Sequence, residues 1–263
     1  MKKTSLFLLV ISLLCIPALS RAGWVIVTKV KGSDAKEKQE TLYIQGNIMK
    51  SVTDFTIIYD MNTSEFAMLM DSSKTYWKGT TKDYKDGIVE MMKARIAEEL
   101  KALPENQRPY AERMYNDALD KFISGVGNDT VKVKTEVKKM NEKLTIATYT
   151  AQKYEVWVNN IKKVDMWISE KINIAPDFNY AAFVKFMKEL TNSRSDLAYQ
   201  TSPEYIAILN KGFSLKSFDA DNSITRETLS VEKKQLDNTV FDIPQGYRKV
   251  TLNEILLLQN KKQ

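Results

Sequence analysis

Carboxylates are the residues of this chain with the widest scope for chemistry, because its 263 residues include no His and a single Cys. The chain therefore has no Ser-His or Cys-His nucleophile pair, no His-ligated metal and no disulfide. Nine scattered Gly also leave no phosphate-binding loop. Asp219, Asp221 and Glu227 could hold a cation or act as a glycosidase pair, but a turn at Asn222 is expected to separate Glu227 from the others. We interpret them as a solvated hairpin tip, and predict a non-enzymatic protein with no catalytic residue, metal or cofactor.

Large apolar side chains suggest a different kind of site, one that binds an apolar ligand. Within the segment 65–71, alternate residues are large and apolar, and around 157 and 167 both faces of the expected strands carry large apolar groups. A strand that is apolar on both faces is covered on both, here by the core and by either a ligand or a helix. Flexible Met side chains also suit variable acyl chains. The possible lining residues are Phe66, Met68, Met70, Trp77, Trp157, Trp167 and Phe186. The same spacings are more often those of ordinary core.

Period-2 alternation predicts the strands that carry these residues. The first group covers 24–31, 38–46, 55–60, 65–71 and 75–79, and the short turn-like segments between them predict antiparallel hairpins. A second group is expected at 130–137, 143–149, 153–158 and 163–171, and a third at 215–220 and 223–234, ending at 240–243.

Helical periodicity interrupts the strands. A hairpin of two helices is expected at about 83–127, broken at Pro104 and closed by Gly125 and Gly127. A helix over 177–191 would start at Asp177 as its N-cap. Two shorter helices are expected, one with Ser202 as N-cap, Pro203 at its first position and Gly212 past its end, and one with a Thr251/Glu254 capping box and with Leu252, Ile255 and Leu258 facing inward.

Antiparallel strands with inserted helices indicate an α+β fold. We predict a strongly curved antiparallel sheet of about 10–11 strands, an unclosed half-barrel with helices covering its concave side. No linker composition divides the chain, so residues 23–263 are expected to form a single domain with the helical-hairpin insertion. Small-ligand sites are concave and mostly apolar, which directs attention to the concave side.

The first 22 residues have the composition of a signal peptide. Lys2 and Lys3 precede an apolar run over 6–19, and Ser20 and Ala22 occupy the −3 and −1 positions of a cleavage site. The apolar run is too short to span a bilayer, which takes about 20 residues. Cys15 follows Leu14 where a lipobox requires a small residue, so lipid anchoring is not expected. We predict export without a transmembrane segment, to the periplasm of a Gram-negative bacterium.

Removal of the signal peptide on export also changes the net charge of the protein. Loss of Lys2, Lys3 and Arg21 lowers the net charge from +6 to +3. This small excess without a concentrated basic face does not favour nucleic-acid binding. We expect a monomer whose partner is either a lipid or other hydrophobic ligand, or a protein of the envelope.

Three segments resemble a known family. They are 43–50 (YIQGNIMK), 57–60 with 66–71 and 75–77, and 241–247 (FDIPQGY), with a weaker fourth match at 155–158. Together they resemble an exported bacterial family of unknown function with the fold of the periplasmic lipoprotein carriers (LolA-like or LolB-like). The resemblance implies an unclosed barrel that holds acyl chains, and it likens 241–247 to the closing strand and Pro-x-Gly turn of that fold. The helical hairpin departs from the carrier pattern, and no carrier binding residue is transferred.

Two functions remain open on the sequence. The preferred one is a non-catalytic periplasmic or envelope protein that binds a lipid, lipopeptide or other apolar ligand in the groove, with the hairpin or the 177–191 helix as a lid. The alternative is an envelope protein-interaction module whose groove is filled by its own helices, including Phe183, Phe186, Met91 and Met92.

Overall fold

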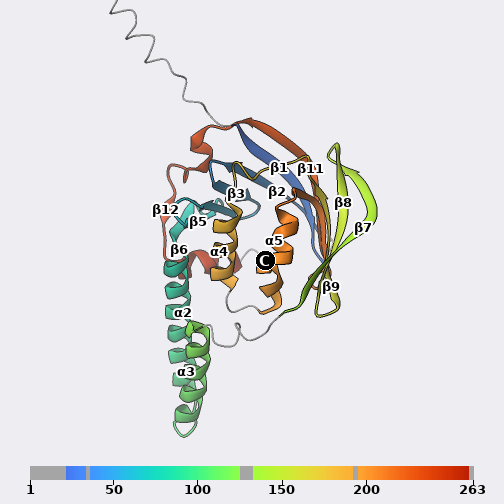
Figure 1. Cartoon of the computed structure of the whole chain (residues 1–263). Helices are drawn as coiled ribbons and strands as arrows, with labels where there is room; N and C mark the ends of the chain where they lie inside the picture. Colours follow the sequence, from blue (N-terminus) through green and yellow to red (C-terminus); the bar gives the residue numbers. More distant parts are fainter. Residues whose placement is uncertain (1–21, 34–35, 125–132, 192–194, 261–263) are drawn as a thin grey trace, which may run out of the picture.

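A computed structural model describes residues 22–33, 36–124, 133–191 and 195–260. The predicted signal peptide up to Arg21, including Cys15, and the two glycines expected to close the hairpin, Gly125 and Gly127, lie outside these residues. The described chain folds as one curved sheet of twelve strands with helices on its concave side (Figure 1). The strand order is β12-β6-β5-β4-β3-β2-β1-β11-β10-β9-β8-β7.

The first six strands form consecutive antiparallel hairpins. A two-residue loop joins β2 to β3 through Gly46 (φ 58°) and Asn47 (φ 65°), and both angles are left-handed as a type I′ turn requires. This turn has the right-handed twist that the flanking strands need. The strands are β1 (Ala22–Lys31), β2 (Glu37–Gln45), β3 (Ile48–Val52), β4 (Thr56–Asp60), β5 (Glu65–Met70) and β6 (Thr75–Thr80).

The other half of the sheet differs from the prediction in one respect. The two strands expected at 130–137 and 143–149 are a single long strand, whose register shifts between Lys139 and Lys143. Such a bulge breaks the alternation of the side chains, which is why the sequence suggested two strands. The strands are β7 (Thr135–Ile146), β8 (Tyr149–Val158), β9 (Ile161–Ser169), β10 (Phe213–Asp219) and β11 (Ile224–Gln235).

The segment 236–247, which we call the strap, crosses the convex face instead of adding a strand. The expectation of a strand at 240–243 is wrong: η2 (Asn238–Phe241) is a 3₁₀-helix with Asp237 as its N-cap. A left-handed Gly246 (φ 83°) then turns the chain into β12 (Arg248–Lys249), which pairs in parallel with β6. In the described residues the end strands β7 and β12 do not pair, so the predicted unclosed half-barrel is confirmed.

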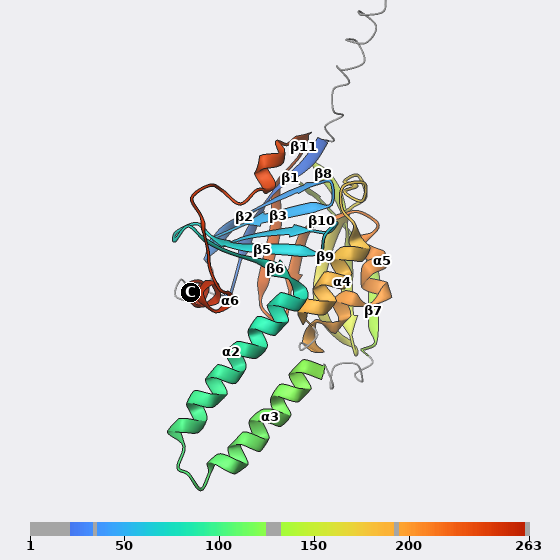
Figure 2. The same cartoon turned by 90° about the vertical axis from the view of Figure 1, so that its left-hand side faces the viewer.

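Four short helices occupy the concave side: α4 (Tyr180–Thr191), η1 (Ser195–Thr201), α5 (Pro203–Leu209) and α6 (Leu252–Asn260). Figures 1 and 2 show the sheet curving around them. Ser202 caps α5 as predicted, by accepting from the Tyr205 N–H. At the start of α6, Thr251 accepts from the Glu254 N–H, although the Glu254 carboxylate binds Arg248 instead of completing the box.

Helix α4 starts later than the sequence predicted. Asp177 is not the N-cap, because the side chain of Asn179 accepts the Ala182 N–H and α4 begins at Tyr180. Asp177 is instead buried, at 4 % exposure, where its carboxylate accepts the indole N–H of Trp24 at 3.1 Å. This bond connects the entry of α4 to the first strand of the sheet.

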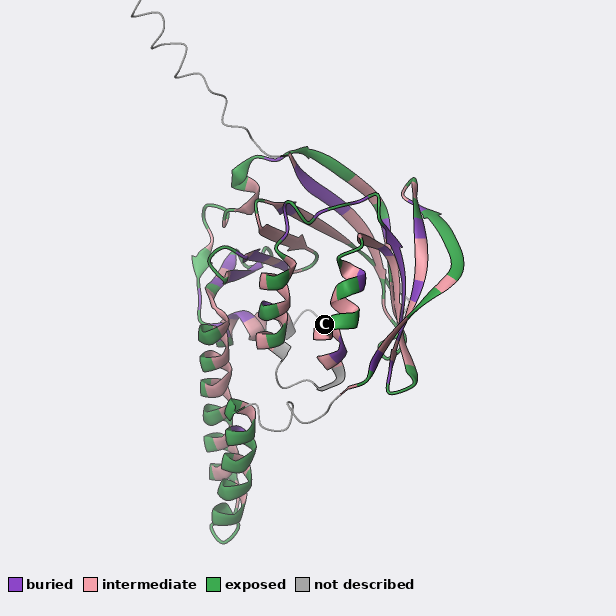
Figure 3. Ribbon diagram, viewed as in Figure 1, coloured by how far each residue is buried: buried purple, intermediate pink, exposed green. Residues whose placement is uncertain are grey.

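The predicted helical hairpin is present as α2 (Thr81–Ala102) and α3 (Arg108–Ser124). Thr80 and Asp83 form a reciprocal capping box at the start of α2. Only the first turns of α2 contact the core, through Tyr84 and Ile88, and the rest projects away from the sheet as an arm (Figure 2). The arm is exposed or half-buried almost throughout (Figure 3). It therefore does not close over the concave side in this structure.

Candidate functional site

The concave face over β4–β6 is filled by aromatic side chains. Phe186 of α4 stacks on Tyr59 of β4, with ring centroids 3.9 Å apart, and contacts Phe66 of β5 edge-on at 5.2 Å. Phe66 in turn meets Trp77 of β6 at 5.1 Å. Six of the seven expected lining residues thus belong to one buried cluster, each at most 7 % exposed: Phe66, Met68, Met70, Trp77, Trp167 and Phe186. Helix α4 covers this part of the face.

The remaining expected lining residue, Trp157, lies elsewhere. Val156 and Val158 belong to the cluster that packs under η1 and α5, so strand alternation places Trp157 on the opposite, convex face. Its ring lies under the Lys138 ammonium, 4.2 Å from the centroid, and its indole N–H donates to Glu155. The structure therefore separates Trp157 from the other six expected lining residues.

Trp167 belongs to the main buried cluster, but strand alternation points it away from its neighbours Met166 and Ile168, which pack under α5. The Lys153 and Lys216 ammonium groups lie 4.9 and 5.8 Å from the centre of its ring, and its indole N–H donates to Glu142. Lys153 is also 3.3 Å from Glu142. Both tryptophan rings are thus in contact with lysine ammonium groups through cation–π interactions.

Two hollows remain on the concave side beyond the aromatic cluster. The inner hollow, of about 320 Å³, lies between the sheet and η1/α5, and the outer hollow, of about 340 Å³, reaches α6 at Gln259. Glu40 of β2 and Arg226 of β11 line both hollows, so the two are parts of one concave groove. The apolar walls of the inner hollow include Leu42, Met166, Tyr205, Leu209 and Leu215, and those of the outer hollow Val30, Phe55, Ile57 and Met70.

Charged groups line the groove in its middle and at both ends. The Glu40 carboxylate accepts the Ser51 hydroxyl at 2.7 Å, and Lys38 pairs with Asp54 at 2.7 Å. Asp219, at the inner end, accepts two backbone N–H groups and the amide of Asn222, and so caps its own turn. The turn predicted for this segment is confirmed, and these carboxylates do not face a common point with Glu227, which pairs with Lys216.

The pKa of the Tyr205 hydroxyl, on α5, indicates that the inner hollow has low polarity. Burial raises the pKa of its hydroxyl well above the usual value, and the nearby Tyr199 and Asp219 add to this, while Arg226 acts in the opposite direction. The side chain lines the hollow with its ring edge-on to Tyr199 at 5.5 Å. A deprotonated phenol is thus disfavoured here, and the hydroxyl is a neutral hydrogen-bonding group at ordinary pH.

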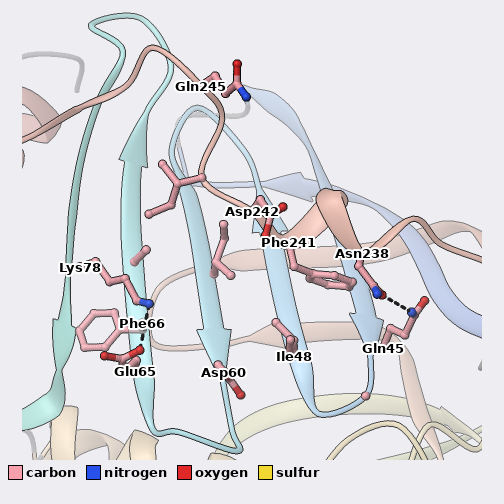
Figure 4. A pocket seen from close by; sticks show the side chains of 14 residues that line it. Gln45, Ile48, Asp60, Glu65, Phe66, Lys78, Asn238, Phe241, Asp242 and Gln245 are labelled. Carbon is pink, nitrogen blue, oxygen red and sulfur yellow. Dashed lines mark hydrogen bonds and ion pairs between the residues drawn. The ribbon is translucent and has the colours of Figure 1, made fainter.

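A third and larger hollow lies on the convex face, under the strap. It has a volume of about 890 Å³, and Figure 4 shows its floor on the strands and Phe241 and Asp242 of the strap above it. Lys50 holds the strap by donating to the Val240 carbonyl at 2.8 Å, and burial lowers the pKa of this lysine. At the other end, the Tyr247 hydroxyl donates to Asp71 at 2.7 Å.

Arg226 and Glu40 were not among the residues singled out from the sequence. Alternation along 224–228 does place Arg226 on the same strand face as Thr228. Charged residues on strands are usually solvated, however, and only the curvature of the sheet turns this face inward. In the described ranges, no group of three or more His, Cys, Asp or Glu residues could hold a metal ion. Among the helices described, none is long and apolar enough to cross a membrane.

Several solved structures are similar to this chain. PNGF-II aligns with 91 % of the chain at 10 % identity and a TM-score of 0.39, and the chain spans about a third of its length (33 %). An uncharacterized conserved protein from Thermus thermophilus aligns at 7 % identity and a TM-score of 0.42, covering 88 % of this chain and 91 % of that one. A LolA superfamily protein from Nitrosomonas europaea aligns at 8 % identity and a TM-score of 0.24, covering 85 % and 91 %. At these scores the likenesses carry no argument about function.

Sequence comparisons identify a family. None of the curated proteins matches the chain. The model of a domain of unknown function, DUF4412, matches residues 90–247, which include α3, β7–β11 and the whole strap. This match covers more than half of the 263 residues and confirms the expectation of a family of unknown function. The chain therefore belongs to the DUF4412 family.

Proposed function

We propose that this protein is a non-catalytic binding protein of the bacterial cell envelope that holds a lipid, a lipopeptide or another apolar molecule in its concave groove. The observation that carries the proposal is the groove itself: two adjoining hollows of about 320 and 340 Å³ with many apolar side chains in their walls. Ligand pockets for small molecules are typically about 300–1,000 Å³ and mostly apolar. The groove matches both properties.

The energetics of such a ligand favour burial of a hydrocarbon chain. Each methylene group that leaves water contributes about 0.8 kcal/mol, so a chain of several buried methylenes binds without a specific polar partner. The Met166 and Met70 thioethers in the two hollows are flexible enough to adapt to chains of different shape. Binding is then tolerant of ligand shape, as a carrier or sensor of lipids requires.

The proposed location follows from the first 22 residues. Lys2, Lys3 and the apolar run over 6–19 support export, and we propose the periplasm of a Gram-negative bacterium, with a monomeric mature protein that starts at Gly23. N-terminal sequencing of the protein from the periplasmic fraction of its own host tests this. A mature protein that still begins at Met1, or that stays in the cytosol, would contradict it.

A second function is favoured by the arm. Tyr110, Met114 and Ile123 of α3 are 67, 57 and 56 % exposed, and α3 packs mainly on α2. Part of the concave face is also filled by Phe186. An envelope protein-interaction module, with the arm as its docking element, is therefore the alternative. It predicts a stable protein that carries no lipid.

Native mass spectrometry of the protein purified from its own host distinguishes the two. The proposal predicts co-purified lipid and binding of a fluorescent fatty acid, and a Leu42→Trp variant, which fills the inner hollow, should lose most of that binding. Leu229→Trp is the matched control, because Leu229 is 50 % exposed and lines neither hollow. Thermal unfolding of both variants checks that they fold. Absence of lipid together with absence of fatty-acid binding by the wild type rejects the proposal.

A further inference from the structure

Arg226 is the cation at the junction of the concave groove. It lines both the inner and the outer hollow from β11, opposite Val30 of β1. The side chain is exposed, and within the described part of the chain its guanidinium forms no hydrogen bond or ion pair. An arginine presents five donors in a planar fork that fits a carboxylate or phosphate. These donors are available to a ligand in the groove.

The other charged groups of the groove are engaged with neighbours. Lys38 pairs with Asp54, the Glu40 carboxylate accepts from Ser51, and Asp219 caps the turn that follows it. Arg226 thus differs from the other two cations that line the groove, because Lys38 has a carboxylate partner at 2.7 Å in Asp54 and Lys216 has one at 2.6 Å in Glu227. Because Glu40 lines the same junction, its charge reduces the attraction for an anion but leaves the donors of Arg226 unoccupied.

The surroundings of Arg226 are amphipathic in a way that suggests one ligand geometry. Apolar walls extend from it in two directions, toward Leu42 and Leu209 in the inner hollow and toward Ile57 and Met70 in the outer one. A hydrocarbon chain in either hollow would bring its polar end to the junction. A solvent-connected junction also lets an ionised headgroup keep part of its hydration, which limits the cost of binding a charge.

We propose that Arg226 anchors the anionic headgroup of a single-chain amphiphile whose hydrocarbon tail lies in the concave groove. The inference rests on the proposed function and adds the class of ligand to it: the headgroup is a carboxylate or a phosphate, bound through a bidentate, charge-assisted contact. A neutral amphiphile of equal length binds in the same hollow but forms no such contact.

Four C16 probes test the assignment by calorimetry or tryptophan fluorescence: palmitate, hexadecyl phosphate, hexadecanol and hexadecyltrimethylammonium. Wild-type protein should bind palmitate or hexadecyl phosphate at least about tenfold more tightly than hexadecanol, and the cation most weakly. Arg226→Gln should remove the preference while leaving hexadecanol binding unchanged, and Arg226→Lys should restore part of it. The tighter of the two anions identifies the headgroup as a carboxylate or a phosphate.

Lys29→Gln is the matched control. It makes the same change in net charge one residue from Val30, but Lys29 lines neither hollow and contacts Glu37. This variant should retain the full preference for anions, which separates a local contact from the effect of net charge. If Arg226→Gln keeps the preference, or if Lys29→Gln loses it equally, the anchor assignment is wrong while the groove proposal stands. If the wild type binds none of the four probes, the groove proposal itself fails.

Discussion

The ring of Phe186 lies on that of Tyr59 with centroids 3.9 Å apart and planes inclined by 19°, so α4 is attached to the middle of the sheet by an aromatic stack. The stack determines which part of the concave side is core and which part is groove. Where Phe186 of α4 covers Tyr59 and Phe66 the face is closed. The inner hollow lies past α4 over β1, β2 and β9–β11, and the outer hollow lies over β1–β5 on the side of α6.

Truncation of Phe186 should lower the stability of the protein. Phe186→Ala removes a ring that is 6 % exposed and packs against three other rings, so the free energy of unfolding should fall by about 3–5 kcal/mol. Urea denaturation followed by tryptophan fluorescence measures it. Ile123→Ala on the exposed arm is the control and should change stability by less than about 0.5 kcal/mol. Similar losses in the two variants would contradict the role given to the stack.

The buried bond between Trp24 and Asp177 should be measurable in the same way. Trp24→Phe removes the donor and leaves a buried carboxylate without this partner, which should cost about 1–3 kcal/mol beyond the lost area. A double-mutant cycle with Asp177→Ala isolates the interaction. The corresponding bond of Trp157 to Glu155 is only partly buried, and Trp157→Phe should cost less. Additive effects of the two Trp24/Asp177 changes would show that the bond is not stabilising.

Alkaline pH should weaken the fold through two tyrosines. Burial raises the pKa of Tyr180 to about 12, and burial together with the hydrogen bond to Asp71 raises the pKa of Tyr247 to about 12. Between the unfolded value of about 10 and these folded values, the unfolded chain has lost protons that the folded chain keeps, so stability falls as pH rises. The stabilisation is fully present below pH 10.

Urea denaturation at pH 8, 10 and 11 tests this. The free energy of unfolding should decline above pH 10, and Tyr247→Phe and Tyr180→Phe should each flatten the decline, because phenylalanine has no proton to lose. Tyr110→Phe, on the exposed surface of α3, serves as the control and should leave the slope unchanged. An identical slope in all variants would argue that neither tyrosine titrates in this window.

A close approach of two backbones makes Gly212 intolerant of any side chain. A Cβ at this position would lie 2.2 Å from the Ser169 carbonyl oxygen, and this atom belongs to the end of β9 and cannot rotate away. Gly212→Ala should therefore destabilise the protein by at least about 1–3 kcal/mol through overpacking. Gly246→Ala has open space around it and should suffer only the backbone cost of its left-handed φ. Equal melting temperatures for wild type and Gly212→Ala would contradict the close approach.

Local patterns in the sequence were enough to predict most of the strands and helices. Alternation predicted the hairpin strands of β1, β2 and β4–β6, and Ser202, Pro203 and Thr251 marked helix starts that the structure confirms. These features depend on residues within a few positions of one another, so they can be predicted from the sequence alone. The absence of His likewise excluded His-dependent nucleophile pairs and His-ligated metal sites without knowledge of the fold.

The tertiary structure decided the features that depend on residues far apart in the sequence. Alternation says which side chains share a strand face, but the curvature of the whole sheet decides which face is concave. The curvature separated Trp157 from the other expected lining residues and placed Arg226 at the concave groove. Asp177 became a buried partner of Trp24 because packing brought together residues 153 positions apart. The groove exists for the same reason: it is the volume left between a bent sheet and helices whose positions depend on contacts distant in the sequence.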